Sequence, residues 1–217
     1  MKKLFCSAAI LGLNMLTSIT AQAADSVAYD WSGIYLGANV GGAWNNSNWT
    51  DGSGRSTPFD PNGSGWVGGG QIGYRQQINN IVLGIEGNLD FASLEGKALC
   101  LGTVPNCITK QNFLGSVQAN LGFAADKLYV YGTGGIAFTN YDHSEEITLV
   151  QKWNTDSRTG WTAGIGAEYA FGNNWSAGVQ WNYYDFGSVT VGGGTNPVSV
   201  NFKETENVVT ARLNFKF

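Results

Sequence analysis

Hydrophobic and polar residues alternate with a period of two over most of the chain. The last eleven residues, NVVTARLNFKF (207–217), show this clearly, with polar residues between the apolar positions Val209, Ala211, Leu213, Phe215 and Phe217. Such alternation is typical of a β-strand with one apolar and one polar face. Because the last residues of a chain usually fray, a pattern that reaches the final residue predicts that the C-terminus is held in a sheet.

The same alternation recurs in seven further stretches. They cover residues 31–44, 65–77, 81–91, 111–124, 128–141, 157–171 and 174–187. Together with the C-terminal stretch they predict eight strands, and each strand has an apolar face that needs a cover.

The connections between these strands alternate in length. Long connections cover 45–64, 92–110, 142–157 and 188–204, and short ones lie at 79–80, 125–127 and 172–174. A two-layer β-sandwich also has strands at regular spacing, but its connections have no reason to alternate. The pattern therefore favours an all-β fold, an eight-stranded antiparallel up-and-down transmembrane β-barrel with four long outer loops and three short inner turns.

Aromatic residues gather near the ends of the predicted strands, where interfacial side chains of membrane proteins are found. They are Trp31, Trp44, Trp66, Tyr74, Trp161, Tyr169, Trp175 and Tyr183. In lipid every backbone polar group must be paired, so the sheet must close and the last strand must pair with the first. We therefore expect Phe217 at the inner rim of an aromatic girdle.

The N-terminus has the features of a secretory signal peptide. Lys2 and Lys3 precede an apolar stretch (4–19), and Ala21-Gln22-Ala23 is a small-residue cleavage site. The apolar stretch contains polar residues and is shorter than the ~18 residues that suggest a transmembrane helix. The predicted division is a signal peptide (1–23) removed after Ala23 and a barrel domain (24–217).

Charge and cysteine content add two expectations for the exported chain. Without the signal peptide the chain has 10 basic and 16 acidic side chains, so we expect no nucleic-acid partner. Only Cys100 and Cys107 remain, in CLGTVPNC. Two cysteines in a short Gly- and Pro-containing loop of an exported protein predict a disulfide, whereas a metal site would need more ligands.

The polar faces of the predicted strands carry charged residues that would lie inside the barrel. These are Arg75, Glu86, Asp90, Glu168 and Arg212. Eight strands enclose an interior that side chains just fill, and unpaired charges there would be costly. The hypothesis is a structural ion-pair network that plugs the lumen; the alternative is a narrow or gated pore lined by the same groups.

Catalytic chemistry finds little support in the sequence. His143 is the only histidine and lies in DHSEE, without a serine–histidine–acid arrangement. Glycine runs such as 68–70 lack the strand–loop–helix context of a phosphate site. We expect no enzyme activity, no catalytic or metal-binding residues and no cofactor.

Five segments of the chain together resemble one family. They are DWSGIYLGANVG, VLGIEGNLDF, LYVYGTGGIAF, GWTAGIGAEYAF with NNWSAGVQWNYYDFG, and VVTARLNFKF. The resemblance is to the small outer-membrane surface-antigen family, also labelled outer membrane immunogenic or porin-family proteins, with a barrel similar to the transmembrane domain of outer-membrane protein A. It covers essentially the whole exported chain.

The resemblance implies a location, partners and a function. It implies the outer membrane of a Gram-negative bacterium and contact with its lipid. Phe217, and with it Phe215, resembles the C-terminal signal that the barrel-assembly machinery reads. The implied function is a structural and antigenic surface protein that displays loops to host or environmental ligands. Alternatives are a small porin for narrow passive diffusion, or a surface barrel that binds a haem-like ligand through Tyr141, His143, Tyr183 or Tyr184.

Overall fold

The computed structural model describes residues 29–51, 63–99, 106–145, 156–191 and 200–217. The predicted signal peptide with its cleavage site after Ala23 and Cys100 of the predicted disulfide lie outside these residues. Among the described residues, no helix is long and apolar enough to cross a membrane.

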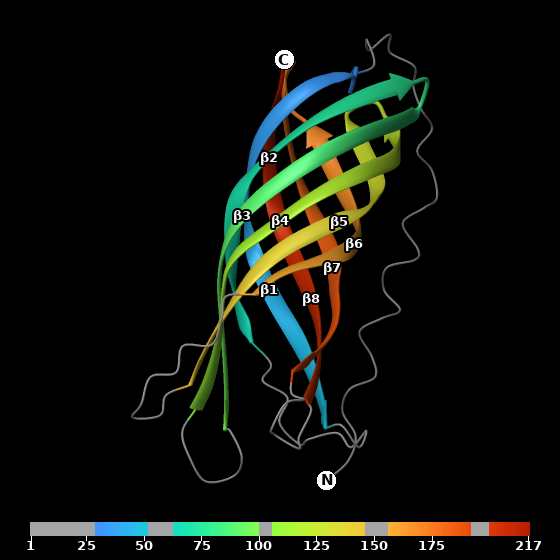
Figure 1. The fold of residues 1–217 in the computed structure, drawn as a ribbon. Helices are drawn as coiled ribbons and strands as arrows, with labels where there is room; N and C mark the ends of the chain where they lie inside the picture. Colours follow the sequence, from blue (N-terminus) through green and yellow to red (C-terminus); the bar gives the residue numbers. More distant parts are fainter. Residues whose placement is uncertain (1–28, 52–62, 100–105, 146–155, 192–199) are drawn as a thin grey trace, which may run out of the picture.

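Eight antiparallel strands form a closed barrel, in which each strand pairs with its neighbours in sequence and β1 pairs with β8 (Figure 1). The strands are β1 (Gly33–Asp51), β2 (Ser64–Ile78), β3 (Ile81–Leu99), β4 (Asn106–Ala125), β5 (Leu128–Glu145), β6 (Asp156–Ala170), β7 (Trp175–Val191) and β8 (Val200–Lys216). The predicted fold class, an eight-stranded antiparallel up-and-down barrel, is confirmed.

Three short connections lie at one rim of the barrel, which we call the inner rim. Asn79 and Asn80 join β2 to β3, Asp126 and Lys127 join β4 to β5, and residues 171–174 join β6 to β7. Asn79 and Asp126 have positive φ angles of 56° and 52°. Asn and Asp adopt this left-handed conformation more readily than other non-glycine residues, which explains their place in two-residue turns.

At the opposite, outer rim the strands extend beyond the stretches that alternation predicts. The structure continues strands through 45–51, 92–99, 106–110, 142–145, 188–191 and 200–204, so the prediction of loops there is wrong. Backbone pairing runs to Asp51↔Val200 and Leu99↔Asn106. These hydrogen bonds form between backbone groups, so the strands continue where the side chains no longer alternate between apolar and polar. Figure 1 shows β3, β4 and β5 projecting on one side of the outer rim and β1, β7 and β8 on another.

A band of exposed apolar side chains, the apolar belt, surrounds the barrel. It runs from Ile34 to Trp44 on β1 and from Ile81 to Phe91 on β3, eleven residues in each case. A tilted strand needs ~9–11 residues to cross a bilayer. Outward residues beyond the belt, such as Asn46 and Ser93, are exposed and polar. The belt therefore has the height of a membrane, and the strand extensions lie outside it.

The C-terminus is held in the sheet at the inner rim (Figure 1). The Phe217 amide donates to the Ile34 carbonyl at 3.0 Å, and Lys216 exchanges hydrogen bonds with Asn174. The Phe217 ring is 72% exposed on the belt and contacts the Phe215 ring edge-on, with centroids 5.2 Å apart. Closure of β1 on β8 thus explains why the alternation continues to the last residue.

Candidate functional site: a filled lumen

An ion pair between Arg75 and Glu168 crosses the lumen near the inner rim. Two hydrogen bonds join the guanidinium to the carboxylate, Nη1 to Oε2 at 2.9 Å and Nη2 to Oε1 at 2.6 Å. Both side chains are buried. Ser176 and Asn214 also donate to Oε2 of Glu168, at 3.0 and 3.1 Å. This two-pronged geometry is the strong form of an Arg–carboxylate contact.

Aromatic rings surround the Arg75 guanidinium. Its central carbon lies 4.1 Å from the ring centroid of Tyr35, 5.0 Å from that of Tyr129, and 5.8 Å from those of Tyr131 and Trp31. Rings within about 6 Å attract a cation through their quadrupole. The arginine, which is only 3% exposed, is therefore compensated by one carboxylate and four rings.

Glycines on the lumen face make room for these rings. A Cβ on Gly166 would lie 2.5 Å from Cζ of Tyr131, and a Cβ on Gly73 would overlap the Tyr35 ring. Any larger residue at either position would displace a tyrosine. Some of the 31 glycines of the chain thus serve the packing of the lumen.

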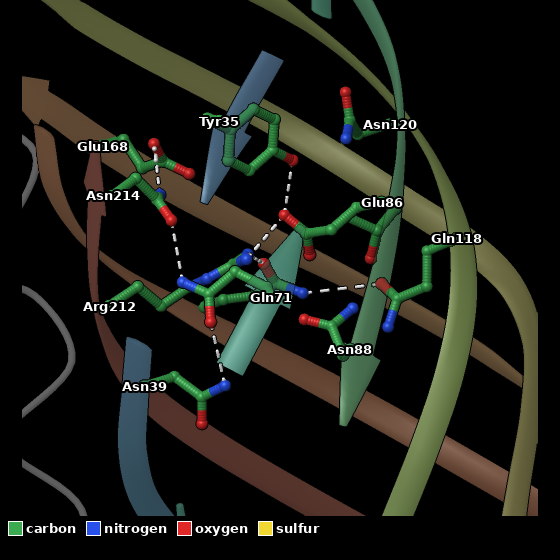
Figure 2. A network of polar contacts seen from close by, with 12 residues as sticks. Tyr35, Asn39, Gln71, Glu86, Asn88, Gln118, Asn120, Glu168, Arg212 and Asn214 are labelled. Carbon is green, nitrogen blue, oxygen red and sulfur yellow. Dashed lines mark hydrogen bonds and ion pairs between the residues drawn. The ribbon is translucent and has the colours of Figure 1, made fainter. Parts of the chain in front are cut away.

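A second ion pair joins Arg212 to Glu86, with Nη2 2.5 Å from Oε2. The Tyr35 hydroxyl donates to the same oxygen at 2.6 Å. Figure 2 shows both contacts converging on Glu86 from opposite sides. Nη1 of Arg212 also contacts the Tyr131 hydroxyl at 3.2 Å and Oε1 of Gln180. The two ion pairs are thereby linked through Tyr131, which donates to Glu168 as well.

Asp90 belongs to neither pair and lies two inward positions beyond Glu86 on β3, toward the outer rim. Its Oδ1 accepts a hydrogen bond from Nδ2 of Asn39 at 2.8 Å. Asn39 also donates to Gln71, which donates in turn to Asn214 (Figure 2). Of the five charged residues singled out in the sequence, the structure brings four together in ion pairs and connects Asp90 to them only through amides.

Trp31 closes the inner mouth of the lumen, a role that the sequence analysis missed. It is 3% exposed, its backbone amide donates to Gln77, and its indole N–H donates to the Asp126 carbonyl at 3.1 Å. Its ring packs against Tyr129 and Tyr29. The expectation of Trp31 in the interfacial girdle is therefore wrong. Trp31 is four residues before Tyr35, and with a period of two both side chains point to the same, inward face. The sequence could have predicted its position from this spacing.

The other aromatic residues expected in the girdle face outward. Trp44, Trp66, Tyr74, Trp161, Tyr169 and Trp175 are between 43% and 58% exposed, and Tyr183 packs on Trp161 with ring centroids 5.5 Å apart. They lie at both ends of the apolar belt, as interfacial aromatics do.

Toward the outer rim an apolar layer crosses the lumen. Its buried side chains are Ala43, Val67, Ala92, Leu94, Leu114, Ala137, Tyr184, Phe186 and Val208. Between this layer and the ion pairs is a cavity of about 10 Å³ lined in part by Asn39, Asp90 and Arg212, which is room for about one water molecule. The described part of the lumen is thus filled in successive layers.

The remaining predicted residues divide into three groups. Cys107 lies in β4, but its partner Cys100 is outside the described residues, so the disulfide stays a prediction. Tyr141 lies in β5 as predicted, His143 belongs to β5 rather than to a loop, and the side chains of both are not described. Tyr184 is buried in the lumen while Tyr183 faces outward. These last two tyrosines lie on opposite faces of β7 and share no site.

The fold and its two faces define a class of protein. A closed antiparallel barrel with an apolar belt outside and polar side chains inside is the architecture of an outer-membrane β-barrel protein. The model of the outer membrane protein beta-barrel domain family matches residues 11–217. The chain belongs to this family.

Several known proteins are similar to this chain. The 31 kDa outer-membrane immunogenic protein of Brucella melitensis is 33% identical over 207 residues, which cover 87% of this chain and 85% of that protein. The 22 kDa outer membrane protein of Rhizobium leguminosarum bv. viciae is 31% identical over 163 residues, 74% of this chain and 67% of that protein. OprG from Pseudomonas aeruginosa has a similar fold, with a TM-score of 0.60, 12% identity and coverage of 88% and 98%.

These similarities confirm the predicted resemblance and the outer-membrane location. They also confirm the main predicted function, an outer-membrane β-barrel surface protein, since the relatives are named as outer-membrane immunogenic proteins. They give no support to the predicted alternatives, a small porin or a ligand-binding barrel.

Proposed function

We propose that this protein is a sealed scaffold, a barrel that does not conduct ions and that holds its outer loops at the cell surface. The observation that carries the proposal is the filling of the lumen. Trp31 occupies the inner mouth, two buried ion pairs cross the middle, and the apolar layer lies nearer the outer rim. A hydrated ion finds no continuous path through such layers.

The scaffold role assigns no catalytic step to the chain. The immunogenic names of the relatives fit a protein met at the bacterial surface rather than an enzyme. The partners that we propose are outer-membrane lipid around the belt, the barrel-assembly machinery during biogenesis, and host or environmental ligands at the outer loops.

Single-channel recording in a planar bilayer tests the seal. Purified, oxidised barrel whose insertion is verified should give no stepwise openings, while a general porin in the same bilayers should give them. Reproducible openings from the barrel alone would overturn the sealed scaffold and favour the small porin.

Epitope tags test the display of loops. A tag inserted between residues 146 and 155 should be labelled on intact cells. A matched tag at the Asp126–Lys127 turn, which lies at the opposite rim, should be labelled only after permeabilisation. The reverse pattern would contradict the proposed orientation.

A further inference from the structure

The outer end of the lumen contains a second polar cluster, which the ion pairs described above do not include. This outer polar cluster consists of Gln111, Thr139, Arg158, Glu204 and Glu206, all 7% exposed or less. Among the described side chains of β8, the exposed apolar residues end at Val209, and Glu206 is three positions further toward the outer rim. Glu206 therefore lies beyond the apolar belt, on the side of the outer loops.

One hydrogen bond of this cluster joins strands on opposite sides of the barrel. Nε2 of Gln111, on β4, donates to Oε2 of Glu206, on β8, at 3.1 Å. In the closed order of the strands, three strands separate β4 from β8 in either direction. Figure 1 shows β4 and β8 in the two separate projections of the outer rim. The bond between Gln111 and Glu206 therefore links these two groups of strands across the lumen.

The orientation of the Gln111 amide is fixed by Thr139. A hydroxyl group has one proton to donate, and the Thr139 hydroxyl donates it to the Phe113 carbonyl at 2.9 Å. Towards Gln111 it can only accept, and Nε2 of Gln111 donates to it at 2.9 Å. The amide nitrogen therefore stays on the side of Thr139 and Glu206, and rotating the amide by half a turn would break both of its hydrogen bonds.

The contact between Gln111 and Glu206 leaves two buried oxygens without a hydrogen-bond partner, Oε1 of Gln111 and Oε1 of Glu206. With Glu206 ionised both atoms are acceptors, so neither can bond to the other. A protonated carboxyl group has one O–H donor. A proton on Oε1 of Glu206 would let it donate to Oε1 of Gln111, while Nε2 of Gln111 donates back to Oε2. A single proton thus pairs both oxygens and closes a ring of two hydrogen bonds.

The charges around Glu206 also favour its protonated form. Nη1 of Arg158 lies 3.5 Å from Oε2 of Glu204, so one carboxylate already balances the guanidinium of this cluster. Glu206 is 0% exposed, and a second buried anion here would be costly. Burial raises the pKa of Glu206 from 4.5 to about 7; the bond from Gln111 lowers this pKa, and the charge of Glu204 raises it.

Few other charged or titratable groups face Glu206. Among the described residues of the outer lumen they are Glu204 on β8, Arg158 on β6 and Tyr184 on β7, and Asp90 lies on the other side of the apolar layer. The described inward residues that the other strands contribute are uncharged: Asn45 on β1, Val67 on β2, Leu94 on β3, Gln111 on β4 and Thr139 on β5.

We propose that Glu206 is a proton-binding site and that, with Gln111, it forms a pH-sensitive latch at the outer end of the barrel. With the proton bound, the acid–amide ring ties β4 to β8. When the proton leaves to water, the bond to Oε1 of Gln111 is lost and a buried anion remains. Because the folded state holds this proton more tightly than the unfolded chain, the stability that the proton supplies is complete below about pH 4.5 and is lost as the pH rises to about 7.

A carbon-13 NMR titration of the glutamate carboxyl carbons, in the refolded barrel in detergent micelles, tests for the proton. We expect one carboxyl group that titrates at about pH 7 and that is missing in Glu206→Gln. Glu204→Gln should move this titration to lower pH, because it removes a neighbouring negative charge. Asp185→Asn should leave it unchanged, because Asp185 pairs with Thr205 on the outward face. Completion of every glutamate titration below about pH 5.5 would overturn the proposal, as would a titration at about pH 7 that persists in Glu206→Gln.

The pH dependence of thermal unfolding tests the latch. The amide in Glu206→Gln can donate to Oε1 of Gln111 as the acid does, but at every pH. Between about pH 5 and about pH 8 the wild type should therefore lose at least tenfold in its folding equilibrium constant relative to this variant, seen as a larger fall in its unfolding midpoint. Equal falls in the two proteins would overturn the latch. If Glu206→Gln fails to fold, the titration in Glu204→Gln still decides, because a titration that does not move would show that the proton is not on Glu206.

Discussion

The ion pair of Arg212 and Glu86 shows how far the lumen depends on single side chains. Both side chains are 2% exposed, so Glu86→Gln leaves a buried guanidinium without its anion. Breaking a buried pair in this way costs about 3–5 kcal/mol. Because the new amide can still accept from Tyr35, we expect a loss at the lower end, about 3 kcal/mol, seen as a lower thermal unfolding midpoint in detergent.

A double variant distinguishes the pair from mere packing. In Glu86→Gln combined with Arg212→Met, no unpaired charge remains, so part of the lost stability should return. An unchanged midpoint in Glu86→Gln alone would show that the network contributes nothing to stability.

The glycines opposite the tyrosines offer a second test at the same scale. Gly166→Ala places a Cβ 2.5 Å from the Tyr131 ring, whereas Gly134→Ala on the outer face would meet nothing closer than 3.9 Å. Overpacking of this kind costs about 1–3 kcal/mol. We expect a lower unfolding midpoint for Gly166→Ala and a wild-type midpoint for Gly134→Ala. Equal midpoints in the two variants would contradict the close packing of Tyr131.

At the scale of the elements, β8 has two separable roles. Its backbone closes the barrel by pairing with β1, and the amide of Phe217, the residue after β8, bonds to Ile34 whatever side chain it carries. The Phe217 ring is mostly exposed and is proposed as an assembly signal. Phe217→Ala should therefore lower the amount of barrel assembled in cells, yet leave the unfolding midpoint of refolded protein nearly unchanged.

Phe171 provides the control for that experiment. It is another exposed aromatic residue of the inner rim, 47% exposed and outside β8. Phe171→Ala should assemble at the wild-type level. If both variants assemble equally poorly, the effect belongs to the aromatic girdle and not to a C-terminal signal.

The elements also show what alternation can predict. The pleat fixes a period of two, so the sequence predicts correctly that Glu86 and Glu168 face inward. It does not predict their partners, because Arg75 and Glu168 are 93 positions apart and meet only through closure of the barrel. Nor does it predict the strand extensions, where backbone pairing continues after the apolar belt has ended.

Considered as a whole, the molecule has its barriers to ions in series. Removing a residue from one layer of the lumen leaves the other layers in place. Ion conductance through successive layers is limited by the narrowest of them. Trp31→Ala alone should therefore stay silent in planar bilayers. A triple variant, with Trp31, Arg75 and Glu168 all replaced by Ala, removes the side chain at the inner mouth and the nearest ion pair together. It leaves no unpaired charge from that pair.

We expect this triple variant to remain silent as well, because the Arg212–Glu86 pair and the apolar layer still cross the lumen. Adding Glu86→Ala and Arg212→Ala, which remove the second pair together, and Leu114→Gly and Phe186→Gly, which thin the apolar layer, should give the first small openings, provided that the barrel still migrates as a folded species on unheated gels. Openings from Trp31→Ala alone would show that the inner mouth is the sole barrier. The lumen would then be a gated pore with Trp31 as its gate, and the sealed scaffold would have to be abandoned.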